Sequence, residues 1–242
     1  MYNIIMEIQT QSCYNKKITK ECCMYKIIDL KTWNKRKQFE WFNTFSNPCY
    51  GFNTEIDVTE VVNFSKKTKN SFFINFLFLV MKSFNSVEEL RLRIVENEIR
   101  LYDVINPTYI VMTDSGIFEN CGCPMHEKYN EFYKDCHNDV EGAKKQKKVK
   151  DEYNDDNYNV YYITCVPWLC YTTMTHPLPD NNKESSSVPR ICWGKFELKN
   201  NRYVLPFNLT VSHAFVDGYP LSKALNNLKQ NSLNCLDIFE KN

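Results

Sequence analysis

The sequence lacks an excess of charge of either sign, since 30 Lys and Arg residues stand against 29 Asp and Glu residues over 242 positions. A nucleic-acid-binding protein presents a basic surface, so this balance argues against that class. The segment 142–157 has a basic half followed by an acidic half, whose fields would cancel, and we interpret it as a helix end and a solvated loop. We therefore expect no nucleic-acid partner.

Long hydrophobic runs are also missing. The most apolar stretch, Phe72–Phe84, is shorter than the roughly 20 residues that a membrane span needs, and Asn75 and Lys82 interrupt it. A buried helix explains this stretch better. The N-terminus has no continuous apolar segment of the kind found in a cleaved secretory signal. We expect no membrane association and a cytoplasmic location.

No Gly-rich phosphate loop and no Gly-x-Ser-x-Gly nucleophile elbow occurs, which argues against the sites built on those motifs. Cysteine is abundant instead: the 11 residues are odd in number and irregular in spacing, which predicts reduced thiols in a reducing compartment. One group resembles a zinc set, but its Cys-x-Cys spacing is unusual for zinc, so we expect no metal. Its members are Cys121, Cys123, His126, Cys136 and His137.

Apolar residues make up 43% of the chain, which is enough for a packed core. Residues 1–23 are polar and weakly periodic, and we expect them to be a flexible N-terminal extension of a single domain spanning 24–242. The elements of that domain do not alternate regularly between strand and helix, so they predict an α+β fold. We expect strands at 25–29, 55–59, 90–95, 99–102, 109–112, 158–166, 191–198 and 203–212, and helices at 30–45, 60–69, 70–84, 127–140 and 221–228.

The segment Val211–Gly218 is the strongest functional motif. It places His213 at the end of an apolar run and Asp217 four residues later, directly before a glycine. Histidine is the side chain best suited to move a proton near neutral pH, and an Asp-Gly pair favours a tight turn. The pattern His-x-x-x-Asp-Gly is a signature of coenzyme-A-dependent acyltransferases. The alternative is a core histidine bound only to backbone.

Other short pieces of the sequence accompany the His213 motif in a fixed order. Together with the motif itself, they are Ile28-Asp29 with Trp33, Phe39-Glu40-x-Phe42, Ile56-Asp57-Val58-Thr59, Phe72–Phe84, Glu89-Leu90-Arg91, Val166-Pro167-Trp168, Leu205-Pro206 and Ser212–Gly218. Through these pieces, from about residue 24 to 231, the chain resembles the chloramphenicol acetyltransferase family. The resemblance implies a two-layer α+β sandwich in which helices cover a mixed β-sheet. It also implies a homotrimer with active sites at the subunit interfaces, acetyl-CoA as co-substrate, no metal and no acyl-enzyme.

The resemblance assigns catalytic roles to three side chains. His213 would take the proton from the acceptor hydroxyl, and Ser212 stands where the family often has a second histidine. Thr173 would replace a serine whose hydroxyl donates to the oxyanion, although a one-residue shift in register would give that place to Thr172. Asp217 would anchor the loop that holds the histidine.

In the family an arginine pairs with the equivalent of Asp217. Strict alignment places Lys35 at this position, with Arg36 next to it. Lysine lacks the planar, two-pronged contact of arginine. Either Arg36 reaches the carboxylate through a shifted turn, or Lys35 makes a weaker bridge.

The resemblance also places Phe42, Tyr50, Phe118 and Trp168 at or near the substrate pocket. An aromatic slot of this kind suits a flat acceptor, and ordinary core packing is the alternative for these rings. Phe42 stands where the family often has a hydrogen-bonding tyrosine.

We therefore predict an acetyl-CoA-dependent O-acetyltransferase that acts on a hydroxyl of chloramphenicol or a similar small aromatic alcohol, as in antibiotic resistance. One alternative is an acyltransferase with another hydroxyl or thiol acceptor. The other is a trimeric relative that binds a ligand without turnover, which the departures at Lys35 and Thr173 motivate.

Overall fold

The computed structural model describes residues 25–146 and 158–240. Its main element is a seven-stranded sheet of order β2-β10-β8-β7-β5-β6, with β9 paired to β10 outside this path, and β1-β4-β3 form a smaller antiparallel sheet. In the large sheet β7 runs parallel to β5 and β8, so the sheet is mixed. The strands are β1 (Tyr25–Ile27), β2 (Cys49–Asp57), β3 (Leu92–Val95), β4 (Glu98–Tyr102), β5 (Asn106–Met112), β6 (Phe118–Gly122), β7 (Val160–Val166), β8 (Arg190–Gly194), β9 (Glu197–Lys199) and β10 (Arg202–Ser212).

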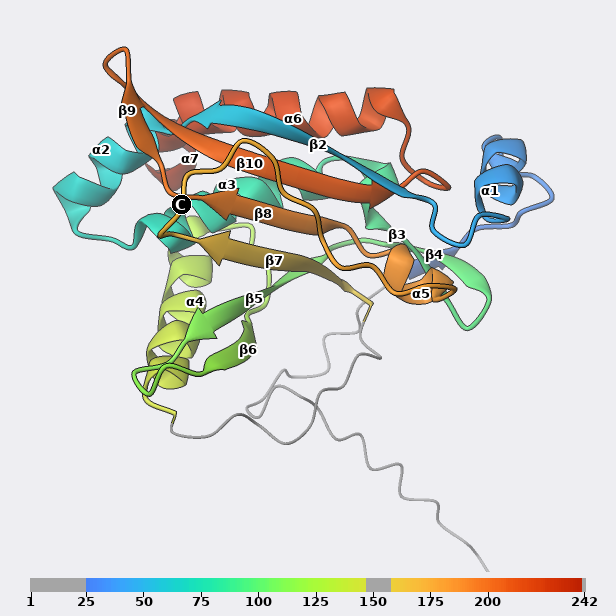
Figure 1. The fold of residues 1–242 in the computed structure, drawn as a ribbon, viewed down its shortest axis with the longest axis horizontal. Coiled ribbons are helices and arrows are strands. Elements are labelled where there is room, and N and C mark those ends of the chain that lie inside the picture. Colours follow the sequence, from blue (N-terminus) through green and yellow to red (C-terminus); the bar gives the residue numbers. More distant parts are fainter. Residues whose placement is uncertain (1–24, 147–157, 241–242) are drawn as a thin grey trace, which may run out of the picture.

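Helices cover one face of the large sheet. In Figure 1, α3, α4 and α6 lie behind the strands, and the chain between β7 and α5 crosses the opposite face. This arrangement confirms the predicted α+β fold with a mixed sheet covered by helices. The helices are α1 (Arg36–Phe42), α2 (Thr59–Thr68), α3 (Phe72–Asn85), α4 (Tyr129–Lys144), α5 (Lys183–Ser186), α6 (Gly218–Leu233) and α7 (Cys235–Glu240), with a 3₁₀ turn, η1 (Glu88–Arg91).

The most apolar stretch of the sequence forms α3, as predicted. It is apolar on almost every side because it packs on the sheet and also contacts α2, α4 and α6. Asn75 is fully buried within it; its amide donates to Ser65 Oγ at 2.8 Å and accepts from the Tyr129 hydroxyl at 2.6 Å. These bonds satisfy the buried amide of Asn75, and the other buried polar side chain of the run, Ser83, donates to the Leu79 carbonyl at 2.6 Å. Among the described residues no helix is long and apolar enough to cross a membrane.

Some elements differ from the sequence prediction. The helix expected at 30–45 is confined to α1, because the amides of Thr32 and Trp33 instead bond to the Asp29 carbonyl in a turn. The strand expected at 191–198 is divided into β8 and β9. Both pair with β10, and Pro206, which has no N–H to donate, lies between the two paired stretches. The pattern also does not predict β6, α5 or α7.

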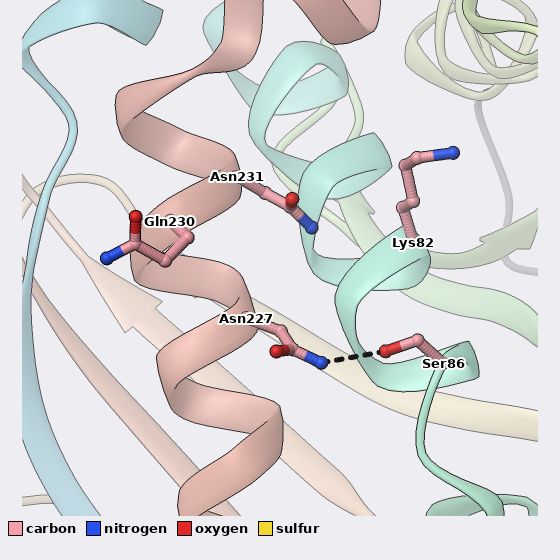
Figure 2. A pocket seen from close by; sticks show the side chains of 5 residues that line it. All are labelled: Lys82, Ser86, Asn227, Gln230 and Asn231. Atoms are coloured by element: carbon pink, nitrogen blue, oxygen red, sulfur yellow. Dashed lines mark hydrogen bonds between the residues drawn. The ribbon is translucent and has the colours of Figure 1, made fainter.

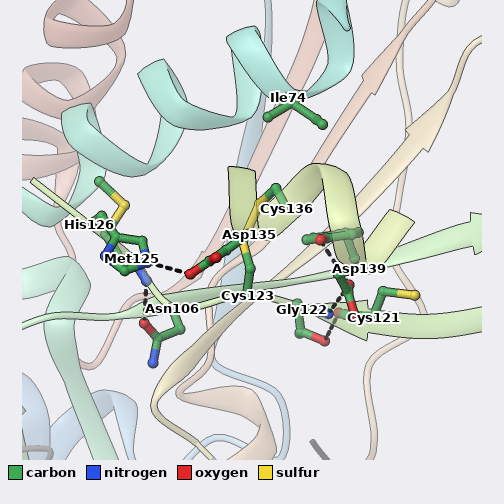
Figure 3. Close-up of a disulfide and its surroundings, with 12 residues drawn as sticks. Ile74, Asn106, Cys121, Gly122, Cys123, Met125, His126, Asp135, Cys136 and Asp139 are labelled. Carbon is green, nitrogen blue, oxygen red and sulfur yellow. Dashed lines mark hydrogen bonds and ion pairs between the residues drawn. A yellow bond between two sulfur atoms is a disulfide. The ribbon is translucent and has the colours of Figure 1, made fainter. Parts of the chain in front are cut away.

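A disulfide corrects the prediction that the thiols are all reduced. Cys123 follows β6 and Cys136 lies on α4, and the fold joins their sulfur atoms, as Figure 3 shows. Both cysteines are buried, because α4 packs against β5 and β6. The other described cysteines are free thiols: Cys49, Cys121, Cys165, Cys170, Cys192 and Cys235.

The predicted N-terminal extension, residues 1–23, lies outside the described residues. The proposed extent of the domain, 24–242, stays a prediction. Within the described ranges, buried residues from the large sheet, the small sheet and the helices form one hydrophobic cluster.

Candidate active site

The Val211–Gly218 motif forms the connection between β10 and α6. The strand ends at Ser212, whose carbonyl accepts hydrogen bonds from the amides of Phe215 and Val216 and closes a tight turn. Asp217 then caps α6, because its carboxylate accepts from the Tyr219 amide at 3.0 Å. The motif therefore fixes the position of His213 between a strand end and a helix start.

Two aromatic rings hold the His213 imidazole. The Phe42 ring of α1 lies 3.9 Å from it, centroid to centroid, at 12°, and the Tyr50 ring of β2 lies 4.5 Å away at 28°. The backbone is also fixed: the His213 amide donates to the Pro48 carbonyl, and the Gln38 side chain donates to the His213 carbonyl at 3.0 Å. These contacts restrict the rotation of the ring, so its orientation is set before any substrate arrives.

The two nitrogens of this imidazole are not equivalent. Nδ1 is buried and has no hydrogen-bond partner among the described residues, whereas Nε2 is not one of the buried unpaired atoms. The residue as a whole is half-buried. Nε2 is therefore the nitrogen that the surrounding residues leave open to a reacting hydroxyl.

Tyr50 ties the strand β2 to the histidine turn. Its hydroxyl donates to the Val216 carbonyl at 3.1 Å. Burial, together with the nearby Asp217 carboxylate, raises the pKa of Tyr50 to about 12. The phenol thus stays a neutral donor over the working pH range, and it holds the turn as well as the imidazole ring.

The structure distinguishes Lys35 from Arg36 as the neighbour of Asp217. The Lys35 ammonium lies 3.8 Å from the Asp217 carboxylate and 2.7 Å from the Glu89 carboxylate, so Glu89 is its nearer partner. Arg36 points elsewhere and pairs with Glu40 at 2.6 Å. Burial alone would raise the pKa of Glu89, but the hydrogen bond from Lys35 holds it below its ordinary value.

Thr173 lies on the segment that crosses the uncovered face of the sheet. Its side chain is exposed, and the amide of the next residue, Met174, donates to Asn53 Oδ1 at 3.1 Å. Asn53 is three residues beyond Tyr50 in β2, about 10 Å along the strand, and an odd separation places their side chains on opposite faces. Within one chain, Thr173 and the Tyr50–His213 pair therefore lie on opposite sides of the sheet. The neighbouring Thr172 is also exposed.

Phe118 and Trp168 are likewise apart from His213. Phe118 lies in β6, at the opposite edge of the sheet from β2, which is about 24 Å across five strand spacings. Trp168 is 63% exposed in the turn after β7. Gly194 lets this turn approach the sheet, because a Cβ there would lie 2.5 Å from the Leu169 carbonyl oxygen. One chain thus brings together Phe42, Tyr50 and His213, and does not bring Phe118 or Trp168 to them.

A groove of about 390 Å³ lies on the outer surface between α3 and α6 (Figure 2). Its lining residues are all polar in type, and those from α6 belong to the second half of that helix, far from the histidine turn. It is therefore not the acceptor pocket. In the described ranges no group of three or more His, Cys, Asp or Glu side chains is arranged to hold a metal ion. The groove is lined by Lys82, Ser86, Asn227, Gln230 and Asn231.

Two further contacts of this site are not predicted from the sequence. Gln38 bonds to the histidine carbonyl, and Glu89 takes the lysine that the alignment gives to Asp217. Glu89 belongs to the Glu89-Leu90-Arg91 piece of the family pattern, and that piece is the sequence feature from which a role for Glu89 could be predicted. The role of Gln38 could not be predicted from the sequence, because a polar residue on a short surface helix has no distinctive spacing.

Comparison with known proteins assigns the family. The model of the family described as chloramphenicol acetyltransferase matches residues 23–229. Chloramphenicol acetyltransferase of Staphylococcus aureus is 27% identical over 205 residues, which cover 84% of this chain and 93% of the relative. The Escherichia coli protein of that name is 23% identical over 209 residues, covering 85% and 93%.

Solved structures agree on the fold. A chloramphenicol acetyltransferase matches with a TM-score of 0.76 at 24% identity, covering 86% of this chain and 99% of its own. The dihydrolipoamide acetyltransferase of Azotobacter vinelandii matches with a TM-score of 0.60 at 13% identity, covering 84% and 88%. Because the family model spans most of the sequence, the chain belongs to the chloramphenicol acetyltransferase family.

Proposed function

We propose that the protein transfers an acetyl group from acetyl-CoA to a hydroxyl of chloramphenicol or a similar small aromatic alcohol, with His213 as the general base. Family membership confirms the broader prediction of an O-acetyltransferase. The acceptor, the base, the trimer and a role in antibiotic resistance in the cytoplasm are parts of the proposal.

The observation that carries the proposal is the held imidazole. A buried Nδ1, two flanking rings and a fixed backbone leave Nε2 of His213 as the reactive atom. A base positioned in this way typically contributes about 10² to 10⁴ in rate. Phe42 and Tyr50 also present aromatic surface next to the base, which suits a flat acceptor.

In the proposed step, Nε2 of His213 takes the proton of the acceptor hydroxyl while that oxygen bonds to the thioester carbonyl carbon. The carbonyl oxygen becomes an oxyanion, to which the Thr173 hydroxyl donates a hydrogen bond. Collapse of this intermediate breaks the carbon–sulfur bond. The imidazolium returns its proton to the departing thiolate, so the products are the acetyl ester and free coenzyme A.

Thr173 would come from a neighbouring subunit. In one chain it lies on the opposite face of the sheet from Tyr50, so it and His213 meet only if two copies pack with these faces together. Exposed apolar side chains on the uncovered face favour such packing, because Ile110, Met112 and Phe118 lie together on β5 and β6. We propose the closed trimer that the family resemblance implies.

A thiol-release assay with acetyl-CoA and chloramphenicol tests the base. His213→Ala should lower kcat by about 10² to 10⁴ with the fold intact. His137→Ala is the matched control, because it removes a ring from the exposed face of α4, where within the described ranges it stacks on Tyr133. The control should keep the parent rate. Undiminished turnover in His213→Ala would eliminate this residue as the base.

Mixed trimers test the shared site. The His213→Ala and Thr173→Ala proteins should each be nearly inactive, but in a random mixture of the two chains some interfaces contain both groups intact. If the two groups come from different subunits, about a quarter of the interfaces, and of the parent activity, should return. If both groups act from one chain, co-assembly restores nothing.

The same assay separates the alternatives. Turnover with other alcohols or with thiols, but not with chloramphenicol, would indicate a different acceptor class. Saturable binding of acetyl-CoA and chloramphenicol without thiol release would indicate a relative that binds without turnover. Either result would replace the acceptor or the reaction in the proposal.

A further inference from the structure

The side chain of Asn208 in β10 uses all of its hydrogen-bonding capacity although it is only 2% exposed. Its Nδ2 donates to the Met174 carbonyl at 3.2 Å and to Asn53 Oδ1 at 3.0 Å. Its Oδ1 accepts from Thr210 Oγ1 at 3.0 Å and lies 3.1 Å from His176 Nε2. Because the Met174 carbonyl can only accept, this set of partners fixes which end of the amide is nitrogen.

Asn53 also contacts Met174, which lies on the segment that crosses the uncovered face of the sheet. It lies directly opposite Asn208 in the β2–β10 register, and its Oδ1 accepts from the Met174 amide at 3.1 Å. The peptide groups on both sides of Met174 are therefore held by two side chains of the sheet. We name Asn53 and Asn208 together the asparagine clamp.

His176 supports the orientation of the clamp. Burial and the charge of Arg190 lower the pKa of His176 to about 4, so the imidazole is neutral at working pH and donates from Nε2 to Asn208 Oδ1. The segment is thus bonded to the sheet at Met174 and again at His176.

The clamp acts on the residue next to it. The Met174 amide belongs to the same planar peptide unit as the Thr173 carbonyl, so fixing that amide fixes the backbone of Thr173. The Thr173 side chain itself is exposed, and among the described residues it has no hydrogen-bond partner. The direction of its hydroxyl therefore depends on the backbone that the clamp sets.

We propose that Asn53 and Asn208 are positioning residues that aim the Thr173 hydroxyl at the oxyanion of the neighbouring site. This inference rests on the proposed function, since it gives Thr173 the role of oxyanion donor. The benefit of such a donor depends on a displacement of less than 1 Å, so a loosened backbone lowers kcat without weakening substrate binding.

Asn53 offers the sharper test because it is exposed and uses only its oxygen. Asn53→Leu removes the acceptor, and we expect about a tenfold lower kcat with both KM values within twofold. Asn53→Asp keeps an acceptor at the same place and should restore kcat to within about threefold of the parent. Asn227→Ala is the control, because it loses a 2.9 Å amide bond to Ser86 on the α3–α6 surface shown in Figure 2.

A double-mutant cycle identifies the path of the effect. If the clamp acts through Thr173, then Asn53→Leu should cost nothing further in a Thr173→Ala background. An equal loss in both backgrounds would overturn the proposal, as would an Asn53→Asp variant as slow as Asn53→Leu, or a change confined to KM.

Amide hydrogen exchange separates failure of the clamp from failure of the proposed function. The Met174 amide should exchange faster in Asn53→Leu, but not in Asn53→Asp or Asn227→Ala. If the Met174 amide exchanges faster in Asn53→Leu but the parent protein shows no turnover, the clamp is supported and its catalytic role is rejected. Unchanged exchange in Asn53→Leu would reject the clamp itself.

Discussion

Replacement of Lys35 tests how the histidine turn is anchored. Its ammonium lies 2.7 Å from Glu89 and 3.8 Å from Asp217, and these side chains are about a quarter to a third exposed. At 3.8 Å, Coulomb attraction amounts to about 1 kcal/mol in water and about 4 kcal/mol at an effective dielectric constant of 20. Solvent screening and the ordering of long side chains reduce the net value to at most about 1 kcal/mol for each pair.

Lys35→Met should therefore lower the free energy of unfolding by about 1–2 kcal/mol, and it should lower kcat because the Asp217 carboxylate loses its nearest cation. Lys35→Arg should act in the opposite direction, since a guanidinium can bond to both carboxylates at once. We expect about 0.5–1 kcal/mol more stability in this variant and a modest rise in kcat.

Urea unfolding at low and high salt, combined with thiol release, measures both effects. The difference between Lys35→Met and the parent should shrink at high salt, as expected for partly exposed charges. Arg36→Met is the matched control, because in the part of the chain that the structure describes Arg36 forms its ion pair with Glu40, on the exposed side of α1. Equal losses in Lys35→Met and Arg36→Met, or a stability difference that salt does not change, would refute the ion-pair argument.

Three further predictions concern single side chains. Thr173→Val keeps the shape of the side chain without its hydroxyl and should lower kcat by about 10² to 10³. Thr173→Ser keeps the hydroxyl, and its kcat should stay within about threefold of the parent value. Equal kcat values for Thr173→Val and the parent would exclude a donor role. Arg93 is fully buried and donates to four backbone carbonyls, so Arg93→Met should cost about 3 kcal/mol by urea unfolding, and an unchanged midpoint would contradict this. The pKa of His176 is lowered to about 4, so the unfolded chain binds the extra proton between pH 6.5 and 4 and stability falls as the pH falls through that range. The loss should be about 2–3 kcal/mol, and His176→Gln should flatten this part of the stability curve; a parallel curve would contradict the assignment.

Local patterns predict the parts of the fold that depend on local chemistry. The run Phe72–Phe84 predicts α3, because an apolar surface on every side leaves burial as the only stable arrangement. The strand β6 was missed because its residues, Phe-Glu-Asn-Cys-Gly, have little preference for a strand, and pairing with β5 decides their conformation. The pairing of Cys123 with Cys136 was missed because it depends on how α4 packs against β6.

In the candidate site, too, local features could be predicted from the sequence and contacts between distant residues could not. The His213 motif is contiguous, so its turn follows from the sequence, although α6 begins at Gly218 and not at the expected residue 221. The structure places Phe42 and Tyr50 beside His213. The choice between Lys35 and Arg36 requires the three-dimensional structure, because the side chains of successive residues at a helix start point about 100° apart. The competition from Glu89 depends on a contact between residues 54 positions apart.

The family resemblance implies a serine where this chain has Thr173, and this change is consistent with the proposed asparagine clamp. A threonine has fewer accessible χ1 rotamers than a serine, so its hydroxyl direction follows its backbone closely. On a mobile loop, any displacement of the threonine backbone would therefore displace the hydroxyl by a similar amount. Bonds at Met174 and His176 remove that freedom within one chain, before any contact with the neighbouring subunit of the proposed trimer. A flexible serine could adjust to a loose loop by rotation, whereas this threonine depends on a fixed one, so Asn53→Leu should cost less in a Thr173→Ser background than in the parent chain.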